Sequence, residues 1–235
     1  MSALTTHEET FFPDRRRLFA GLAHDLQEKL GEIIRKRRKA SLALAGGTTP
    51  GPVYEALSHA PLNWEKVSIT LTDERWVHPD DPASNEYLIR DVLLRRRAAD
   101  ATFIPFKTNH AKASGGAATT EKRITPILPF DICLLGMGPD GHIASLIPGA
   151  EGYAAAVDPD GTKKVAGIHA DNAAGSPERM TLTLPGILSS RRVLLLFMGQ
   201  DKLNVYNEAK SGVGVSPIKD LLAQRKVPVH AFWAP

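Results

Sequence analysis

Hydrophobic residues recur along this chain with two different spacings, and segments of the two kinds alternate. Between positions 14 and 38 the apolar side chains lie three or four residues apart, which predicts a long helix with one apolar face. That face carries Leu18, Leu22, Leu26, Leu30, Ile33 and Ile34. Short apolar runs predict buried strands instead. They lie at 41–45, 67–71, 103–104, 131–135, 165–169, 193–198 and 229–233.

Further helices are expected between these strands. They are predicted to begin near Pro50, to span 85–94 and 112–124, to follow position 200, and to begin near Ser216. Strands that alternate with helices at this spacing predict a mainly parallel, doubly wound sheet with helices on both faces, which is a Rossmann-like α/β fold. Neither a linker nor an internal repeat interrupts the pattern. Residues 1–235 are therefore expected to form a single α/β domain.

The composition agrees with this fold and narrows the class of protein. Hydrophobic residues make up 43% and charged residues 23% of the 235 positions, as in globular domains with a full-sized core. No apolar run approaches the roughly 20 residues that cross a bilayer, and the first twelve positions show no targeting pattern. Cys133 is the only cysteine and lies within an apolar run, which is typical of a reducing compartment. We therefore expect a cytoplasmic protein without a membrane partner.

The net charge of +3 raises the alternative of a nucleic-acid-binding module. The basic residues cluster at 15–17, 35–39, 95–97 and 191–192, at expected helix ends and without interleaved aromatic residues. The cluster at 35–39 ends the first predicted helix, where cations oppose the negative end of the helix dipole. We therefore expect no nucleic-acid partner, and the mild positive charge suits an anionic small molecule.

Three polar motifs follow predicted strands, where ligands bind in doubly wound folds. The first is Gly46-Gly47-Thr48-Thr49-Pro50. Its glycines let the backbone approach a ligand, and the helix that follows offers free N–H groups to an anion. The spacing matches neither the dinucleotide-binding nor the P-loop motif. From its residues alone the segment is either a phosphate-binding loop or an ordinary turn.

The second motif is the charged triplet Asp73-Glu74-Arg75. Burial of three charged side chains is costly unless they are paired or solvated, so the triplet is either a solvated loop or part of a binding site. The adjacent Trp76 and the Ser84-Asn85 helix start, at the same edge of the expected sheet, favour the binding site.

The third motif is the glycine-rich segment 136–145, which presents Asp140 and His142 at an expected helix start. The segment lacks the additional ligands of a metal site and the GxSxG pattern of a nucleophile elbow. We therefore predict that His142 acts as a general base or acid near neutral pH, with no metal in the site.

Five segments in order resemble the 6-phosphogluconolactonase family, within the larger group that includes glucosamine-6-phosphate deaminase. They are ALAGGTTP, TDERWV followed by SNEYLIRDVLL, DICLLGMGPDGHIASLIPG, SPERMTLTLPGIL and GQDK. The resemblance spans nearly the whole chain. It implies hydrolysis of 6-phospho-glucono-1,5-lactone to 6-phosphogluconate in the oxidative pentose phosphate pathway, without a metal or organic cofactor. The expected partner is this small sugar phosphate, and no obligate protein partner is predicted.

Two differences favour the lactonases over the alternative, an amino-sugar-phosphate deaminase or isomerase on the same scaffold. Deaminases carry a Phe-Asn-Glu-Pro-like segment where this chain has Ser145 to Pro148, and a Tyr where it has Arg75. Ile143 departs from the pattern, because lactonases more often have Thr there. A non-enzymatic sugar-phosphate sensor is a further alternative, but it would be expected to carry a DNA-binding domain or a degraded Asp-Gly-His loop.

The motifs and the resemblance together suggest roles for individual residues. His142 is the expected base that takes a proton from the attacking water, and either Asp140 or Asp73 orients its ring. The expected substrate-binding residues are Gly46, Gly47, Thr48, Arg75, Asn85, Gly138, Arg179 and Lys202. Of these, Arg179, Lys202 and Arg75 are expected to supply positive charge to the phosphate, with Arg as a bidentate donor and Lys as a point charge.

Overall fold

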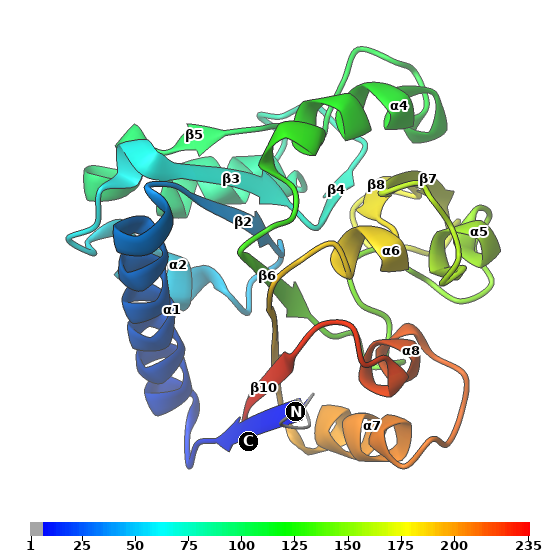
Figure 1. Ribbon diagram of the computed structural model, residues 1–235. Coiled ribbons are helices and arrows are strands. Elements are labelled where there is room, and N and C mark those ends of the chain that lie inside the picture. The colour runs from blue at the N-terminus through cyan, green and yellow to red at the C-terminus, as the bar shows by residue number, and fades with distance from the viewer. Residues whose placement is uncertain (1–6) are drawn as a thin grey trace.

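The computed structural model describes residues 7–235, and its main sheet has the strand order β1-β10-β9-β6-β2-β3-β5 (Figure 1). All neighbouring strands in it are parallel. The strands are β1 (His7–Phe11), β10 (Val229–Ala234), β9 (Val193–Met198), β6 (Ile132–Gly136), β2 (Ala40–Leu44), β3 (Val67–Leu71) and β5 (Thr102–Phe103). Their carboxyl ends therefore meet at one edge. The prediction of no targeting pattern rests on residues 1–12, of which residues 1–6 lie outside the described part.

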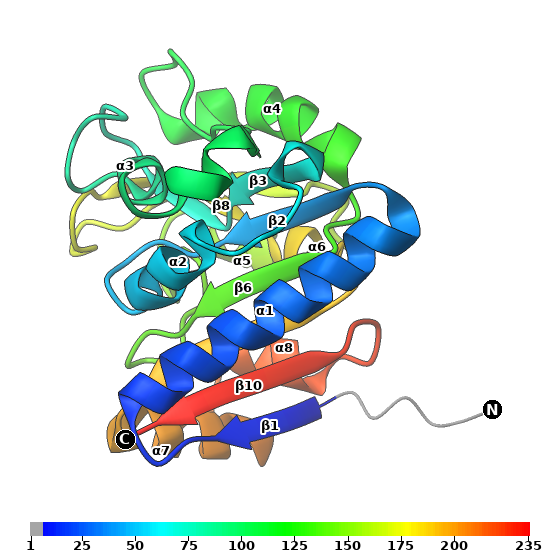
Figure 2. The ribbon, with the colours of Figure 1, turned by 90° about the vertical axis from the view of Figure 1, so that its left-hand side faces the viewer.

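Helices cover both faces of this sheet, as the sequence predicts. Figure 2 shows α1 and α2 in front of the sheet and α6 and α8 behind it. The α-helices are α1 (Arg15–Arg37), α2 (Gly51–Ser58), α3 (Asn85–Leu88), α4 (Ala113–Ile124), α5 (Tyr153–Val157), α6 (Leu184–Ile187), α7 (Gln200–Lys210) and α8 (Pro217–Ala223). Short helical turns are η1 (Trp64–Lys66), η2 (Ile89–Leu93), η3 (Arg96–Asp100) and η4 (Thr125–Ile127). Within residues 7–235, no helix has the length and apolar character needed to cross a membrane.

The long helix α1 shows how local sequence and packing agree. The Asp14 side chain accepts a hydrogen bond from the backbone N–H of Arg17 and so caps the first turn, while basic residues occupy the last turn. The predicted apolar face packs on the sheet, with Leu18, Leu22, Leu26 and Leu30 fully buried. The strands beneath are equally apolar, since every residue of β2 is buried. This two-sided burial explains why short apolar runs predict the central strands.

A second, antiparallel sheet of three strands lies at the carboxyl edge of the first. Its order is β4-β8-β7, with β4 (Asp73–Arg75), β8 (Glu178–Leu182) and β7 (Val165–His169). The run at 165–169 is a strand, as predicted, but its assignment to the main sheet was wrong. A loop without a crossover helix joins β7 to β8, so the chain returns antiparallel. This small sheet brings β4 and β8 to the ligand-binding edge.

The described residues differ from prediction in three further places. The helix expected at 85–94 is split into α3 and a π-helical turn, η2. The helix expected after His142 was wrong, because residues 141–150 form turns and the next helix is α5. Gly141, Ala144 and Gly149 all have positive φ there, which a helix cannot accommodate. The strands β1, β4 and β8 were not predicted, because their sequences are too polar to stand out as apolar runs.

Candidate active site

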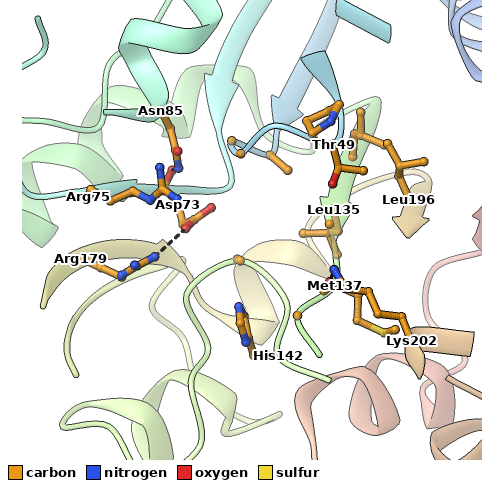
Figure 3. Close-up of a pocket in the computed structure, with 18 residues that line it drawn as sticks. Thr49, Asp73, Arg75, Asn85, Leu135, Met137, His142, Arg179, Leu196 and Lys202 are labelled. Carbon is orange, nitrogen blue, oxygen red and sulfur yellow. Dashed lines mark hydrogen bonds and ion pairs between the residues drawn. The ribbon is translucent and has the colours of Figure 1, made fainter. Parts of the chain in front are cut away.

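A cavity of about 230 Å³ opens at the carboxyl ends of β2, β6 and β9, beside β4 and β8. Figure 3 shows Asp73, Arg75, Asn85 and Arg179 on one wall, Thr49, Met137 and Lys202 on the other, and His142 between them. The predicted site residues that line the cavity are Gly46, Gly47, Asp73, Arg75, Asn85, Gly138, His142, Arg179 and Lys202. Thr48 is exposed and does not line it, whereas the neighbouring Thr49 does. Asp140 lines an adjoining groove and contacts His142 from there.

The glycine loop after β2 is shaped by close packing and by one left-handed residue. A Cβ atom at Gly46 would lie 1.9 Å from Oδ1 of Asn85, so only glycine fits beside that carboxamide. Gly47 has a φ of +84°, a conformation that favours glycine. The hydroxyl of Tyr54 donates to the carbonyl oxygen of Ala45 at 2.6 Å and ties α2 to the end of β2. The backbone of the loop is thereby held open toward the cavity.

Two arginines face each other across the small antiparallel sheet. In the pairing of β4 with β8, Arg75 lies directly opposite Arg179. Like charges in register destabilise a sheet unless a counter-charge lies between them. Arg179 is 7% exposed, and burial lowers the pKa of its guanidinium, with Arg75 adding to this effect and Asp73 opposing it. Nε of Arg75 is buried without a hydrogen-bond partner among the described residues. The pair is therefore suited to bind an anion.

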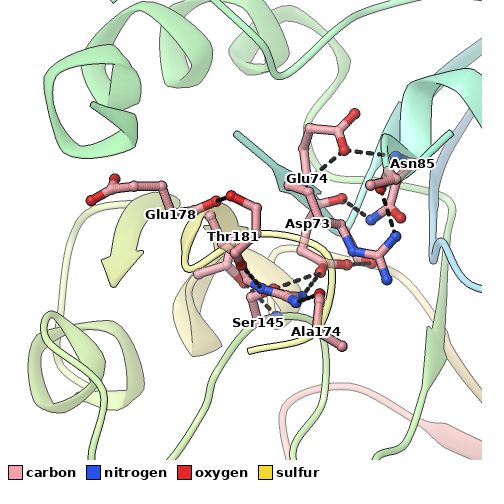
Figure 4. Close-up of polar contacts among 12 residues, drawn as sticks. Asp73, Glu74, Asn85, Ser145, Ala174, Glu178 and Thr181 are labelled. Atoms are coloured by element: carbon pink, nitrogen blue, oxygen red, sulfur yellow. Dashed lines mark hydrogen bonds and ion pairs between the residues drawn. The ribbon is translucent and has the colours of Figure 1, made fainter. Parts of the chain in front are cut away.

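Asp73 is held by hydrogen bonds from hydroxyl groups and by a longer ion pair with Arg179. Its Oδ2 accepts a hydrogen bond from Oγ of Ser145 at 2.6 Å, and its Oδ1 accepts one from Thr72 at 3.2 Å (Figure 4). Nη1 of Arg179 lies 4.0 Å from Oδ2 of Asp73. The carboxylate thus faces the cavity with its orientation set by neighbouring side chains.

Glu74 is a buried residue whose part in the site cannot be inferred from the sequence. Its Oε1 accepts hydrogen bonds from the backbone N–H groups of Arg75 and Asn85 at 2.8 and 2.7 Å. Its Oε2 accepts from Oγ of Ser84 and from the N–H of Glu86 at 2.9 and 2.8 Å. Burial raises the pKa of Glu74 to about 7, against the lowering effect of these donors. One carboxylate thus holds together the strand that carries Arg75 and the helix that carries Asn85.

His142 is oriented by Asp140, two residues before it. Its Nδ1 lies 2.6 Å from Oδ1 of Asp140, and because a carboxylate only accepts, Nδ1 carries the proton. Partial burial would raise the pKa of Asp140, but the charge and hydrogen bonds of His142 lower it overall. Nε2 makes no hydrogen bond to any residue between 7 and 235 and is left for a ligand. Of the two carboxylates proposed to orient the ring, Asp140 makes the contact, whereas Asp73 is bonded to Ser145.

Gly138 provides the space that the His142 ring occupies. A Cβ atom at this position would lie 2.2 Å from both Cε1 and Nδ1 of the ring. Across the cavity, Nζ of Lys202 donates to the carbonyl oxygen of Met137 at 2.5 Å. Its half-buried position lowers the pKa of Lys202, although the charge of Asp140 acts in the other direction. The loop that carries His142 and the helix that carries Lys202 are therefore joined directly.

The fold and the site define a class of protein: an open α/β sheet whose carboxyl edge holds a histidine and three cationic side chains in one cavity. The chain belongs to the family described as glucosamine-6-phosphate isomerases/6-phosphogluconolactonase, whose sequence model matches residues 13–231. The resemblance inferred from the five sequence segments is thereby confirmed.

Individual relatives agree with this membership. The chain is 38% identical over 225 residues to the 6-phosphogluconolactonase of Mesorhizobium japonicum, covering 95% of this chain and 94% of that protein. It is 36% identical over 215 residues to the 6-phosphogluconolactonase of Pseudomonas aeruginosa, covering 90% and 85%. Among solved structures, a 6-phosphogluconolactonase from Shewanella baltica matches with a TM-score of 0.91 and 34% identity, over 100% of both chains. The doubly wound fold predicted from the sequence is confirmed.

Proposed function

We propose that this protein hydrolyses 6-phospho-D-glucono-1,5-lactone to 6-phospho-D-gluconate, the lactone-opening step of the oxidative pentose phosphate pathway. The observation that carries the proposal is that His142, with Nε2 available, shares one cavity with Arg75, Arg179 and Lys202. The names of relatives that are more than a third identical over most of both chains support the same reaction. The cavity suits a substrate that is anionic at one end and hydrolysable at the other.

In this mechanism His142 acts as the general base. With Nδ1–H donated to Asp140, the Nε2 lone pair accepts a proton from water while the water oxygen attacks the lactone carbonyl carbon. The bond between that carbon and the ring oxygen then breaks, and the ring oxygen takes the proton back from the imidazolium. Asp140 holds the ring in place and stabilises its charged form. A positioned base typically contributes about 10²–10⁴-fold to the rate.

The remaining cavity residues bind and orient the substrate in this proposal. Arg75 and Arg179 receive the phosphate as charge-assisted donors, and Lys202 supplies positive charge from the opposite wall. Binding of the phosphate, remote from the carbonyl, places the lactone against Nε2 of His142. Asp73 accepts hydrogen bonds from sugar hydroxyls. The backbone of the glycine loop, with Thr48 or Thr49, adds further donors.

The proposed partner is this small molecule alone. We also propose a cytoplasmic setting, supported by the unpaired thiol of Cys133, which is fully buried. A free thiol of this kind is typical of proteins in reducing compartments.

The test is a hydrolysis assay on freshly generated 6-phosphogluconolactone, compared with the unphosphorylated lactone. We expect the phosphorylated substrate to be strongly preferred, and His142→Ala to lower kcat at least about tenfold while 6-phosphogluconate still binds. His24→Ala, an exposed histidine on α1, serves as the matched control. Near wild-type turnover in His142→Ala would exclude the general-base role. Ammonia release from glucosamine 6-phosphate without lactone hydrolysis would instead identify a deaminase.

A further inference from the structure

Ser145 is a fully buried residue at the centre of the site that the proposed chemistry does not use. Its Oγ donates a hydrogen bond to Oδ2 of Asp73 at 2.6 Å and accepts one from Nη1 of Arg179 at 3.3 Å (Figure 4). Its backbone N–H donates to Oγ1 of Thr181 at 3.1 Å. One residue therefore joins the loop that carries His142 to both β4 and β8.

The hydroxyl of Ser145 lies between two opposite charges. The side chains of Arg179 and Asp73 are 8% and 10% exposed, and they form an ion pair in which Nη1 lies 4.0 Å from Oδ2. A direct charge-assisted hydrogen bond between such groups measures about 2.7–2.9 Å. In a buried setting their attraction is strong, so closure to that distance is the arrangement expected in the absence of Ser145. The hydroxyl of Ser145 makes a hydrogen bond to each of the two charged groups, which themselves stay 4.0 Å apart.

The separation leaves part of the Arg179 guanidinium available. Nε donates to the carbonyl oxygen of Ser176 at 3.1 Å, Nη2 donates to the carbonyl oxygen of Ala174, and Nη1 donates to Ser145. A guanidinium has five N–H donors, so one on each terminal nitrogen has no partner among the described residues. Because Arg75 stands in register with Arg179, these donors lie beside a second positive charge. Closure onto Asp73 would use these donors and neutralise the charge.

We propose that Ser145 is a positioning residue that keeps the Arg179–Asp73 ion pair from closing to direct hydrogen-bond contact, so that the arginine remains available to the substrate phosphate. The inference builds on the proposed function, because it takes the phosphorylated lactone as the ligand. Ser145 itself does not contact the reacting atoms. Its effect should therefore appear in the binding of the phosphate and not in the chemical step.

The experiment measures ligand binding and turnover in Ser145→Ala. We expect the Kd for 6-phosphogluconate and inorganic phosphate, and the KM for the phosphorylated lactone, to rise about tenfold or more, as when a charge-assisted contact is weakened. We expect kcat to stay within about threefold, and hydrolysis of the unphosphorylated lactone to be unchanged. The control is Ser190→Ala, which removes a buried hydroxyl that donates to the carbonyl oxygen of Ile187, outside the cavity. It should lower Tm without changing Kd or KM.

A double-mutant cycle distinguishes this role from a general loosening of the site. In the Asp73→Asn background no carboxylate can capture Arg179, so adding Ser145→Ala should change the Kd for inorganic phosphate less than about twofold. The proposal is overturned if Ser145→Ala leaves Kd unchanged, or if its effect is equally large in both backgrounds. Ser145→Cys, with a similar volume and a weaker donor, gives the same comparison if the alanine variant does not fold. Phosphate binding is measured without turnover, so failure of the wild type to hydrolyse lactone would refute the proposed function separately.

Discussion

Replacement of Gly138 by alanine places a methyl group where the His142 ring lies. The new Cβ would be 2.2 Å from Cε1 and Nδ1 of the ring and 2.8 Å from Oδ1 of Asp140. Ordinary contacts begin at 3.4 Å, so the ring must retreat by about 1.2 Å. The imidazole can do so, because it is 31% exposed and borders an open groove. Its hydrogen bond to Asp140 at 2.6 Å is then broken or bent.

Gly138→Ala should lower the catalytic rate, with little effect on the stability of the fold. A displacement of about 1 Å in a catalytic group can lower the rate about 10²-fold, which corresponds to about 3 kcal/mol of activation free energy. Gly138 does not have a positive φ, so alanine adopts its backbone conformation without strain. We therefore expect kcat for the phosphorylated lactone to fall about 100-fold, while Tm and the Kd for 6-phosphogluconate change little.

Initial-rate kinetics, calorimetric binding and thermal unfolding together check this expectation. The control is Gly115→Ala in α4, where the added Cβ meets its nearest atom, Cδ2 of His110, at an ordinary 3.5 Å. That variant should behave like the wild type. If Gly138→Ala kept kcat within about threefold of the wild type, accurate placement of the His142 ring could not be a requirement of the reaction.

Two further predictions concern the cavity wall. Gly46→Ala places a Cβ 1.9 Å from Oδ1 of Asn85. Steady-state kinetics should therefore show a raised KM, and thermal unfolding should show a loss of stability of about 1–3 kcal/mol. An unchanged KM would contradict this packing. Because burial raises the pKa of Glu74 from 4.5 to about 7, the folded protein binds that proton more tightly than the unfolded chain. The free energy of unfolding should therefore fall by about 3 kcal/mol as the pH rises through that window. Measured by urea unfolding, the free energy of unfolding of Glu74→Gln should depend less on pH in that window than that of the wild type. An equal slope against pH in the two proteins would disprove the raised pKa of Glu74.

The central part of the fold follows from local sequence. Strands such as β2 are buried on both faces, so each is a short, continuous apolar run that stands out without knowledge of its neighbours. The helix α1 is equally evident from its spacing of leucines. The strands β1, β4 and β8 are different, because their sequences are extended only where they pair with a neighbouring strand. Asp73-Glu74-Arg75 pairs with a segment about a hundred positions away, and nothing in the triplet itself indicates that pairing.

The candidate site divides in the same way. Asp140 and His142 are two residues apart, so their contact follows from the loop that contains them, and the sequence identifies them directly. Resemblance to a family indicates Arg179 and Lys202, but not that the arginine lies in register with Arg75 or that the lysine lies on the opposite wall. It also indicated Thr48, whereas the turn at Gly47 leaves Thr49 at the cavity.

The sequence alone therefore determined the class of fold and the family and indicated His142 as the candidate base, because hydrophobic spacing and short motifs are local properties of a chain. Only the tertiary structure decided how Glu74 joins Arg75 to Asn85 and how Ser145 bonds to both Asp73 and Arg179. These contacts connect residues from different elements, and their strength depends on burial. Burial is produced by the whole fold, which brings a second sheet against the edge of the first.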